Sequence, residues 1–300
     1  MSLYKLITPE AFHKLVQSET GRRVIAVDAS WIPTESHVDT KNDFLKKERI
    51  PNAVFFDIDK VKTDSKYPHM MPTLDIFNRE MSKLGLLRDD ILLVYDRLEN
   101  FSASRCALTF GIFGHPLVYL LTSYSKYKEA NFPIDTKEVN DFTPFPKSKY
   151  VSDVDLRDQE IISFETLHNL VKTGEIKNYN FFDARVYERY AGKVAEPRPG
   201  LRSGHVPGAS SLPFKDVLVD GELSSDALTL QSLLQKSFKE RGTSIDETKP
   251  TIVMCASGVT ACIIKTAIEV AGYGKAKLYD GSWTEWALRT GPEETETSSN

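Results

Sequence analysis

The second half of this chain repeats the pattern of the first half at a nearly constant offset. A capped helix pattern at residues 7–16 returns at residues 162–171, which is 155 positions later. Four further pairs of segments keep offsets of 155 to 159: residues 24–29 with 181–184, 50–53 with 206–209, 92–96 with 252–255, and 118–121 with 277–280. Such steady offsets indicate a duplicated domain.

Each copy alternates short β-branched runs with amphipathic helix patterns. We therefore expect an α/β fold in which a mostly parallel sheet in each copy is flanked by helices. The predicted domains are residues 1–125 and residues 160–292. The stretch between them, residues 126–159, is typical of a linker draped over the surface, and the polar tail 293–300 is expected to be disordered. In such sheets ligands bind beyond the carboxyl ends of the strands.

Composition argues against several classes of function. No run of 18 apolar residues is present, so no membrane contact is expected, and a net charge of -4 argues against direct nucleic-acid binding. The first ten residues lack an apolar signal core and an arginine-rich presequence. Three cysteines make no disulfide framework, which favours a reducing compartment. We expect a cytoplasmic protein without a metal or a cofactor, and an additional mitochondrial location stays open.

Cys255 stands where a strand is predicted to end and a helix to begin. An apolar run precedes it, and apolar residues at helical spacing follow as far as Gly272. A loop before a helix N-terminus directs backbone N–H groups towards its centre, where the helix dipole adds partial positive charge. We therefore expect Cys255 to ionise near neutral pH and to act as a nucleophile, with the amides of the loop stabilising an anionic adduct. The loop residues are Ala256, Ser257, Gly258, Val259 and Thr260.

Two alternatives compete with a reactive cysteine. Cys255 could be the buried tail of a core strand, although Gly258 and the small residues before it argue against a plain strand. A cysteine phosphatase would need an arginine six positions after the cysteine, but that position is Ala261. In the first copy the matching residue is Asp96. A carboxylate cannot attack sulfur, so we expect Asp96 to accept hydrogen bonds from the N–H groups of its own loop.

A basic stretch lies in the same copy as Cys255. Residues 185–202 carry five positive and two negative side chains in a protein that is acidic as a whole. The stretch could line the site and hold an anionic substrate, with Arg189 and Arg198 as the favoured residues. It could also be a solvated basic loop, and the sequence leaves both interpretations open.

Other features of the second copy are expected to be structural. His205 precedes a Pro-Gly turn and is expected to anchor it. Ser282 and Glu285 fit a capping box at a helix start. Trp283 and Trp286 are expected in the core or in a pocket wall.

Three motifs of the second copy accompany the duplication: Gly-His-Val-Pro-Gly, Tyr-Asp-Gly-Ser-Trp and Cys-x-Ser-Gly-Val-Thr-Ala. With them, the chain resembles the two-domain rhodanese-like sulfurtransferases of the 3-mercaptopyruvate type, from about residue 3 to residue 292. The fungal members that act in tRNA wobble-uridine thiolation look most similar, through Phe-Phe-Asp-Ile-Asp, Pro-His-Met and the stretch after Leu121. Two departures are Leu-Thr-Ser at 121–123, where the family has Asp-Gly-Gly, and Ala256, where many relatives have glycine.

The resemblance implies a role for each of several residues. The implied sulfur acceptor is Cys255, the implied carboxylate-binding residues are Arg189 and Arg198, and the implied proton relay is Ser257, His69 and Asp59. Thiosulfate-preferring relatives carry cationic residues after the cysteine. The uncharged Ala256 and Ser257 therefore suit a monocarboxylate thiol better than the thiosulfate dianion.

The expected function is sulfur transfer from 3-mercaptopyruvate, or less well from thiosulfate, through a persulfide on Cys255. A thiol such as that of thioredoxin would accept the sulfur, which would feed tRNA wobble-uridine 2-thiolation. The alternative is a persulfide carrier with little small-molecule turnover. Such a carrier would dock with a cysteine desulfurase and pass sulfur to the activating enzyme of a ubiquitin-like carrier.

Overall fold

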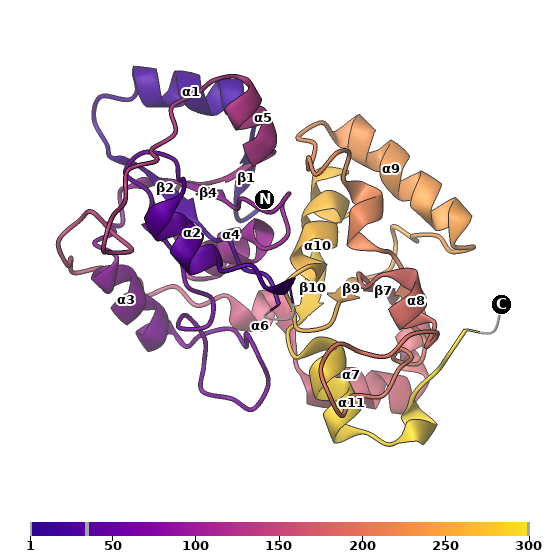
Figure 1. The fold of residues 1–300 in the computed structure, drawn as a ribbon. Coiled ribbons are helices and arrows are strands. Elements are labelled where there is room, and N and C mark those ends of the chain that lie inside the picture. The colour runs from indigo at the N-terminus through magenta and orange to yellow at the C-terminus, as the bar shows by residue number, and fades with distance from the viewer. Residues whose placement is uncertain (1, 34–35, 299–300) are drawn as a thin grey trace. The chain divides into compact units, whose positions relative to one another are not determined.

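The computed structural model describes residues 2–33 and 36–298, which form two compact units (Figure 1). Unit 1 consists of Met1–Thr63, Met71–Leu156 and Asp220–Ser225. Unit 2 consists of Asp64–Met70, Arg157–Val219 and Asp226–Asn300. Each unit therefore includes one short segment whose neighbours in sequence belong to the other unit.

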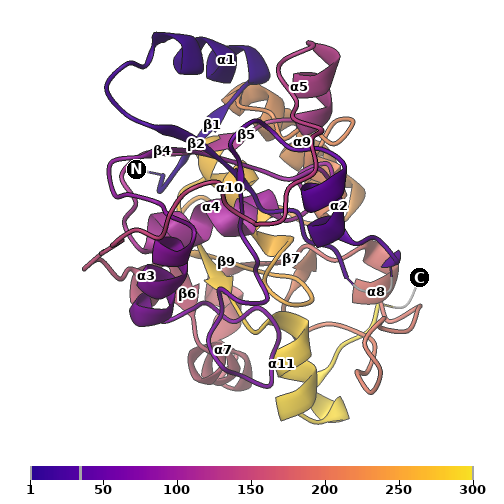
Figure 2. The same ribbon diagram turned by 60° about the vertical axis from the view of Figure 1, so that its left-hand side comes forward.

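Unit 1 is built on a five-stranded sheet in which all neighbouring strands run parallel. The strands, in spatial order, are β1 (Lys5–Ile7), β5 (Val118–Leu121), β4 (Ile91–Tyr95), β2 (Val24–Asp28) and β3 (Val54–Phe55). The helices are α1 (Pro9–Ser18), α2 (Thr40–Lys46), α3 (Leu74–Lys83), α4 (Ala103–Ile112) and α5 (Tyr124–Glu129). Side chains of α1, α2 and α5 share one core with the sheet, while α3 and α4 meet through stacked and edge-on rings of Phe77, Phe110 and Phe113. Figure 2 shows the ribbons of these helices.

Unit 2 has the same strand order and the same parallel pairing. The strands are β6 (Ile161–Ile162), β10 (Ala276–Tyr279), β9 (Thr251–Met254), β7 (Asn180–Asp183) and β8 (Ser210–Ser211). The helices are α6 (Arg157–Glu160), α7 (Phe164–Lys172), α8 (Tyr187–Tyr190), α9 (Ala227–Glu240), α10 (Ala261–Val270) and α11 (Ser282–Arg289), with 3-10 turns η2 (Glu175–Asn178), η3 (Phe214–Val217) and η4 (Pro292–Glu294). The predicted α/β class with helix-flanked parallel sheets is confirmed.

The two matching helix starts are capped as the sequence predicts. Thr8 Oγ1 accepts a hydrogen bond from Ala11 N at 3.2 Å, and Ser163 Oγ accepts one from Thr166 N at 3.2 Å. These side chains satisfy N–H groups that have no partner within the helix. Helices α1 and α7 therefore begin at equivalent points of the repeat.

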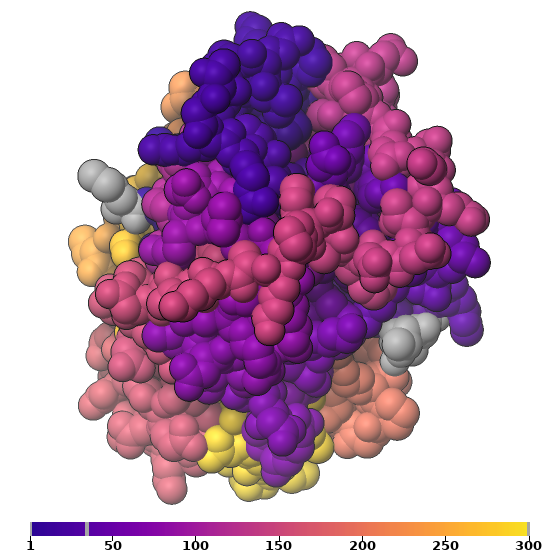
Figure 3. Space-filling view, turned by 90° about the vertical axis from the view of Figure 1, so that its left-hand side faces the viewer, coloured from indigo at the N-terminus to yellow at the C-terminus, as the bar shows by residue number. Residues whose placement is uncertain are grey.

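The stretch predicted to be a linker draped over the surface lies on unit 1 and mostly belongs to it, because unit 1 extends to Leu156 and does not end at residue 125. Phe55 N donates to Phe142 O at 2.8 Å, and Arg49 and Asp135 exchange backbone hydrogen bonds of 3.0 and 2.9 Å. Figure 3 shows this segment, in pink, lying across the surface of unit 1. Its backbone groups find partners there, which a free linker would not provide.

The C-terminal residues also differ from the expected disorder as far as the structure describes them. Glu296 and His205 exchange backbone hydrogen bonds of 3.0 and 2.8 Å, and Ser298 N donates to Ala191 O at 3.2 Å. Residues 299 and 300 lie outside the described residues. Among the helices of residues 2–33 and 36–298, none has the length and apolar character needed to cross a membrane.

Candidate active site

Cys255 lies directly after β9 at the carboxyl edge of the sheet of unit 2, and α10 begins six residues later. The predicted strand–loop–helix arrangement is therefore present. Gly258 within the loop has a φ of +74°, a left-handed conformation that glycine adopts without steric cost. The thiol residue is 2% exposed and its backbone N–H donates to Ser282 Oγ at 3.1 Å.

The amides of the cysteine loop are available as donors. Within the part of the chain that the structure describes, the N–H groups of Ala256, Ser257, Val259 and Thr260 donate to no acceptor. The loop bends through the left-handed Gly258 and runs into the N-terminus of α10, where orphan N–H groups and the helix dipole favour an anion.

The equivalent loop of unit 1 contains an anionic group at the matching position. Asp96 Oδ1 accepts from Leu98 N at 2.9 Å, and Oδ2 accepts from Ser102 N at 2.9 Å and from Ala103 N at 2.7 Å. Burial raises the pKa of this carboxyl, and the three amides oppose the rise. The prediction that Asp96 accepts the N–H groups of its own loop is confirmed.

The first turn of α11 contacts the backbone on either side of the Cys255 peptide. Trp283 N donates to Cys255 O at 3.0 Å, and Ala256 O accepts from Thr284 N at 3.0 Å and from Thr284 Oγ1 at 2.7 Å. Ser282 Oγ, which accepts from Cys255 N, also donates to Tyr279 O at 2.8 Å. These contacts were missed because only the Gly-Ser-Trp motif marks them in the sequence.

The predicted capping box at this helix is wrong. The N-cap is Gly281, and Ser282 is the first helical residue, with a left-handed φ of +52°. Its hydroxyl is occupied by Cys255 N and Tyr279 O, so it does not cap α11. The Glu285 carboxylate pairs with Arg289, and Arg289 Nη1 donates to Glu285 Oε1 at 2.9 Å.

Two members of the implied proton relay meet in unit 2. His69 belongs to the segment Asp64–Met70 of that unit, and its Nδ1 lies 3.2 Å from Ser257 Oγ. Both side chains are buried, and His69 has a left-handed φ of +59°. Asp59 is an exposed residue of unit 1, where its N–H donates to Asp57 Oδ1 at 3.1 Å. The structure therefore brings His69 into contact with Ser257, two residues after Cys255, and the role of Asp59 rests on the resemblance.

Part of the basic stretch forms a buried ion network centred on Arg185 and Glu196, while Lys193 is exposed. Arg185 is 2% exposed and pairs with Asp183 at 2.6 Å and with Glu196 at 2.8 Å. Arg189 also pairs with Glu196, through Nη2 to Oε2 and through Nε to Oε1 at 3.2 Å. Glu196 was missed as a partner, although a single carboxylate between two arginines was a visible signal. The positive charge of Arg189 is partly compensated as a result.

Arg198 is linked to the cysteine loop through one side chain. Its Nη1 donates to Thr284 Oγ1 at 3.4 Å, and Thr284 Oγ1 in turn donates to Ala256 O. Arg198 is half-buried. The two arginines favoured from the sequence thus lie in the same unit as the thiol, and Arg198 is one hydrogen-bonding residue away from its loop.

His205, Trp283 and Trp286 are structural, as the sequence predicts. His205 Nδ1 is hydrogen-bonded to Tyr190 O at 2.9 Å, and its ring stacks on Tyr190 with centroids 3.8 Å apart. Burial lowers the pKa of His205 and so favours its neutral form. Trp283 and Trp286 are fully buried in the core of unit 2, which confirms the core alternative.

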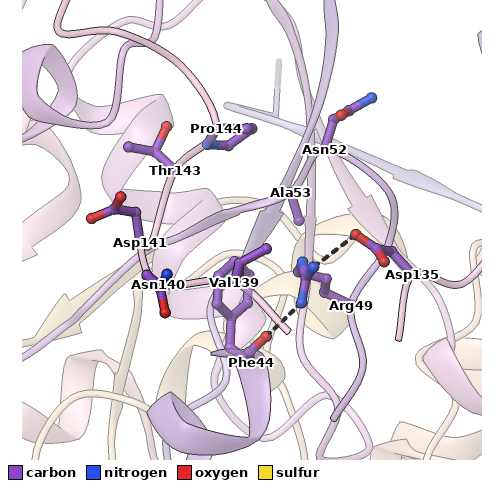
Figure 4. A pocket seen from close by; sticks show the side chains of 10 residues that line it. All are labelled: Phe44, Arg49, Asn52, Ala53, Asp135, Val139, Asn140, Asp141, Thr143 and Pro144. Atoms are coloured by element: carbon purple, nitrogen blue, oxygen red, sulfur yellow. Dashed lines mark hydrogen bonds and ion pairs between the residues drawn. The ribbon is translucent and has the colours of Figure 1, made fainter. Parts of the chain in front are cut away.

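Three cavities lie away from the cysteine loop. One of about 290 Å³ in unit 1 surrounds Arg49, whose guanidinium is held by Phe44 O at 2.9 Å and Asp135 at 2.7 Å (Figure 4). One of about 220 Å³ in unit 1 is lined by Ser30 and Arg97, and one of about 570 Å³ in unit 2 opens at the amino ends of β9 and β10. Among the described residues, no group of His, Cys, Asp and Glu side chains could hold a metal ion.

Comparison with known proteins identifies the family. The family model described as a rhodanese-like domain matches residues 163–289. The thiosulfate sulfurtransferase TUM1 of Saccharomyces cerevisiae is 47% identical to this chain over 298 residues, covering 98% of each chain. The chain belongs to the two-domain rhodanese-like sulfurtransferases. The chain is therefore a sulfurtransferase enzyme, as the resemblance implied.

Other members of the rhodanese-like sulfurtransferases match along most of their length. The rat (Rattus norvegicus) 3-mercaptopyruvate sulfurtransferase is 31% identical over 303 residues, 96% of each chain. The crystal structure of the Tum1 protein from Saccharomyces cerevisiae has a TM-score of 0.96 at 46% identity and covers 100% of both chains. The sulfur transferase subunit of yeast mitochondrial complex I, described as sub-stoichiometric, has a TM-score of 0.82 at 36% identity and covers 98% of this chain and 100% of its own.

Proposed function

We propose that this sulfurtransferase moves sulfane sulfur from 3-mercaptopyruvate to a thiol acceptor through a persulfide on Cys255. The observation that carries the proposal is the loop of Cys255. Four of its amides have no acceptor among the described residues, and the matching loop of unit 1 uses its amides to hold the carboxylate of Asp96. A thiolate or an anionic persulfide at position 255 would take the same place.

The first half-reaction forms one bond and breaks one bond. The Cys255 thiolate attacks the thiol sulfur of 3-mercaptopyruvate, so that a sulfur–sulfur bond forms and the carbon–sulfur bond breaks. The electron pair of the broken bond stays with the carbon, and the enolate of pyruvate leaves. Arg189 and Arg198 hold the carboxylate of the substrate. In the second half-reaction an acceptor thiolate attacks the outer sulfur and releases the Cys255 thiolate.

The pair of Ser257 and His69 is proposed to supply the proton that converts the enolate into pyruvate. The hydrogen bond of 3.2 Å between Ser257 Oγ and His69 Nδ1 supports this role, because a buried pair can pass a proton without solvent. Asp59 is proposed as the residue that orients His69, on the sequence resemblance.

The charge of the site favours a monocarboxylate. Ala256 and Ser257 bring no charge to the loop, and Glu196 offsets part of the charge of Arg189. The two negative charges of thiosulfate would be less fully balanced by positive charge at this site. We therefore propose that thiosulfate is a poorer sulfur donor than 3-mercaptopyruvate. Relatives carry both names, thiosulfate sulfurtransferase for TUM1 and 3-mercaptopyruvate sulfurtransferase for the rat protein.

The deciding experiment compares wild type with Cys255→Ser, using pyruvate release from 3-mercaptopyruvate and mass spectrometry of the Cys255 peptide. We expect the wild type to release pyruvate and to gain one sulfur atom on Cys255, and the variant to do neither. Cys106→Ser and Cys262→Ser serve as controls that keep Cys255. Equal rates of pyruvate release in wild type and Cys255→Ser would refute the proposal.

A persulfide carrier is the second candidate. The structural relative in mitochondrial complex I is a sulfur transferase found as a subunit of a larger assembly, which favours docking to proteins. In this role Cys255 receives sulfur from a cysteine desulfurase and delivers it to the activating enzyme of a ubiquitin-like carrier for tRNA thiolation. Arg189→Ala separates the two roles. If it abolishes mercaptopyruvate turnover but leaves sulfur delivery from a desulfurase intact, the carrier role stands alone.

A further inference from the structure

The backbone of Cys255 and Ala256 is held by the first turn of α11, through contacts that we call the α11 clamp. Its members are Ser282, Trp283 and Thr284. The clamp makes four hydrogen bonds, from Cys255 N to Ser282 Oγ, from Trp283 N to Cys255 O, and from Thr284 N and Oγ1 to Ala256 O, with lengths of 2.7 to 3.1 Å. Ser282 is 0% and Thr284 4% exposed, so water does not compete for these bonds.

The clamp fixes the direction of two amides in the cysteine loop. In a trans peptide the C=O group and the following N–H group point in opposite directions. Because Trp283 holds Cys255 O towards α11, the N–H of Ala256 points away from α11. Thr284 holds Ala256 O in the same way, and the N–H of Ser257 is therefore also turned away. Neither N–H has an acceptor among the residues that the structure describes.

Unit 1 provides an internal comparison, because its loop has no such clamp. Its counterpart of α11 is α5, which follows β5. Across residues 2–33 and 36–298, no N–H or hydroxyl donates to the carbonyl oxygens of Asp96 or Arg97. In that loop the Asp96 carboxylate binds the amides itself, including that of Leu98, the match of Ser257. A neutral thiol is a weak acceptor and cannot organise its loop in this way.

We propose that Ser282 and Thr284 are positioning residues for sulfur transfer, which hold the amides of Ala256 and Ser257 towards the sulfur of Cys255. The inference rests on the proposed function of Cys255 as the nucleophile. An amide donor fixed before the reaction stabilises a developing anion without the cost of reorganisation. In unit 1 the Asp96 carboxylate holds the amides of the loop in place. In unit 2, where cysteine stands at that position, the α11 clamp does so.

Thr284 also joins the clamp to the substrate side of the site. Its hydroxyl donates to Ala256 O and therefore accepts from Arg198 Nη1. One hydroxyl thus aligns the loop and one of the arginines proposed to bind the substrate carboxylate. Its loss is expected to impair both the rate of the chemical step and the binding of the carboxylate substrate.

The test compares Thr284→Val, which removes the hydroxyl, with Thr284→Ser, which keeps it. The first readout is the pH dependence of alkylation of Cys255 by iodoacetamide, followed on the Cys255 peptide by mass spectrometry. We expect Thr284→Val to lower the alkylation rate at neutral pH about 10-fold, and Thr284→Ser to restore it. The second readout is turnover of 3-mercaptopyruvate, where kcat should fall and KM should rise in Thr284→Val.

Thr109→Val is the matched control. Thr109 is 3% exposed in α4 of unit 1, and its Oγ1 donates to Arg105 O at 2.9 Å. It therefore loses the same kind of buried hydroxyl-to-carbonyl bond away from Cys255. Thr109→Val should lower the melting temperature without changing the alkylation profile. If Thr284→Val behaves like Thr109→Val, its hydroxyl is only structural and the proposal is wrong.

The outcomes separate this inference from the proposed function. Alkylation requires no sulfur donor, so it tests the clamp even if 3-mercaptopyruvate is not the substrate. If Cys255→Ser is inactive but Thr284→Val keeps the wild-type alkylation profile, the proposed function of Cys255 is supported. The proposed positioning role of the α11 clamp is then wrong. Should Thr284→Val not fold, Ser282→Ala provides the same test by removing the acceptor of Cys255 N. An unchanged profile in that variant would overturn the proposal.

Discussion

Position 255 and its match at position 96 illustrate how one residue decides what a loop can do. Both residues directly follow the fourth strand of their unit in chain order, β4 or β9, and precede a helix. The Asp96 carboxylate accepts three hydrogen bonds from backbone N–H groups and so holds the loop of unit 1 in one conformation. Cys255 leaves the N–H groups of its own loop at Ala256, Ser257, Val259 and Thr260 without an acceptor among the described residues, so these donors are available for a reacting sulfur.

Replacement of Asp96 should therefore destabilise the protein. Asp96→Ala leaves the N–H groups of Leu98, Ser102 and Ala103 without their acceptor in a buried site, which we expect to cost about 3 kcal/mol of unfolding free energy. Urea denaturation measures this loss. The control is Asp89→Ala, because Asp89 is exposed and in unit 1 as well. A denaturation midpoint equal to that of the control would contradict the prediction.

The sequence revealed residues whose role is local and missed those that act through tertiary contacts. Cys255 was predicted because a strand end, a glycine and a helix start are adjacent in sequence. Ser282 was misassigned because its spacing to Glu285 matches a capping box, whereas the fold turns its hydroxyl to the Cys255 backbone from 27 residues away. The contact of His69 with Ser257 spans 188 residues and could be expected only from the resemblance.

At the scale of elements, α10 is anchored at its centre by a buried cation. Lys265 is 1% exposed, and its Nζ lies 2.8 Å from Glu160 Oε2 and also bonds Glu269 and Ala276 O. Burial by itself would lower the pKa of Lys265, but Glu269 and Glu160 raise it. The helix that follows the Cys255 loop is thereby tied to α6 and to the start of β10.

Loss of this cation should strongly destabilise the fold. Lys265→Met leaves Glu160 buried and without its main counter-charge, for which we expect a loss of about 3 to 5 kcal/mol in unfolding free energy. The double variant Lys265→Met with Glu160→Gln should recover part of the loss, since residue 160 is then uncharged and only Glu269 lacks its cation. Lys236→Met on the exposed side of α9 is the control for urea denaturation. A cost no larger than that of Lys236→Met would show that the buried pair is dispensable.

At the scale of the whole molecule, the repeat predicted the architecture but not the division of the chain. The constant offsets required two sheets of like order, and both have that order. The segments 64–70 and 220–225 each belong to the unit opposite to their sequence neighbours. In unit 1, Gly221 O accepts from Asn100 Nδ2 at 2.8 Å, and Leu223 N donates to Thr122 O at 3.0 Å. The repeat offsets depend only on the local sequence pattern. They therefore could not predict contacts between segments that are more than 100 residues apart, such as Gly221 and Asn100.

Acid should destabilise the molecule through histidines buried in their neutral form. His115 in unit 1 is 3% exposed, with Nδ1 2.8 Å from Tyr150 Oη and Nε2 2.9 Å from Asp90 O. Burial lowers its pKa from 6.5 to about 4, and Arg88 also lowers it, against opposing contributions from the Asp90 carbonyl and from the Asp89 and Asp90 carboxylates. His205 in unit 2 is shifted in the same direction, also by burial.

The sign of the effect follows from proton binding. Below pH 6.5 the unfolded chain protonates His115 while the folded chain does not, so stability falls as the pH drops and the loss is complete near pH 4. Between pH 7 and pH 5 we expect His115 alone to remove about 2 kcal/mol of unfolding free energy. Urea denaturation at several pH values measures the slope, and His115→Gln should flatten it. A variant slope as steep as that of wild type would mean that other groups cause the acid sensitivity, because glutamine at position 115 cannot take up a proton in this range.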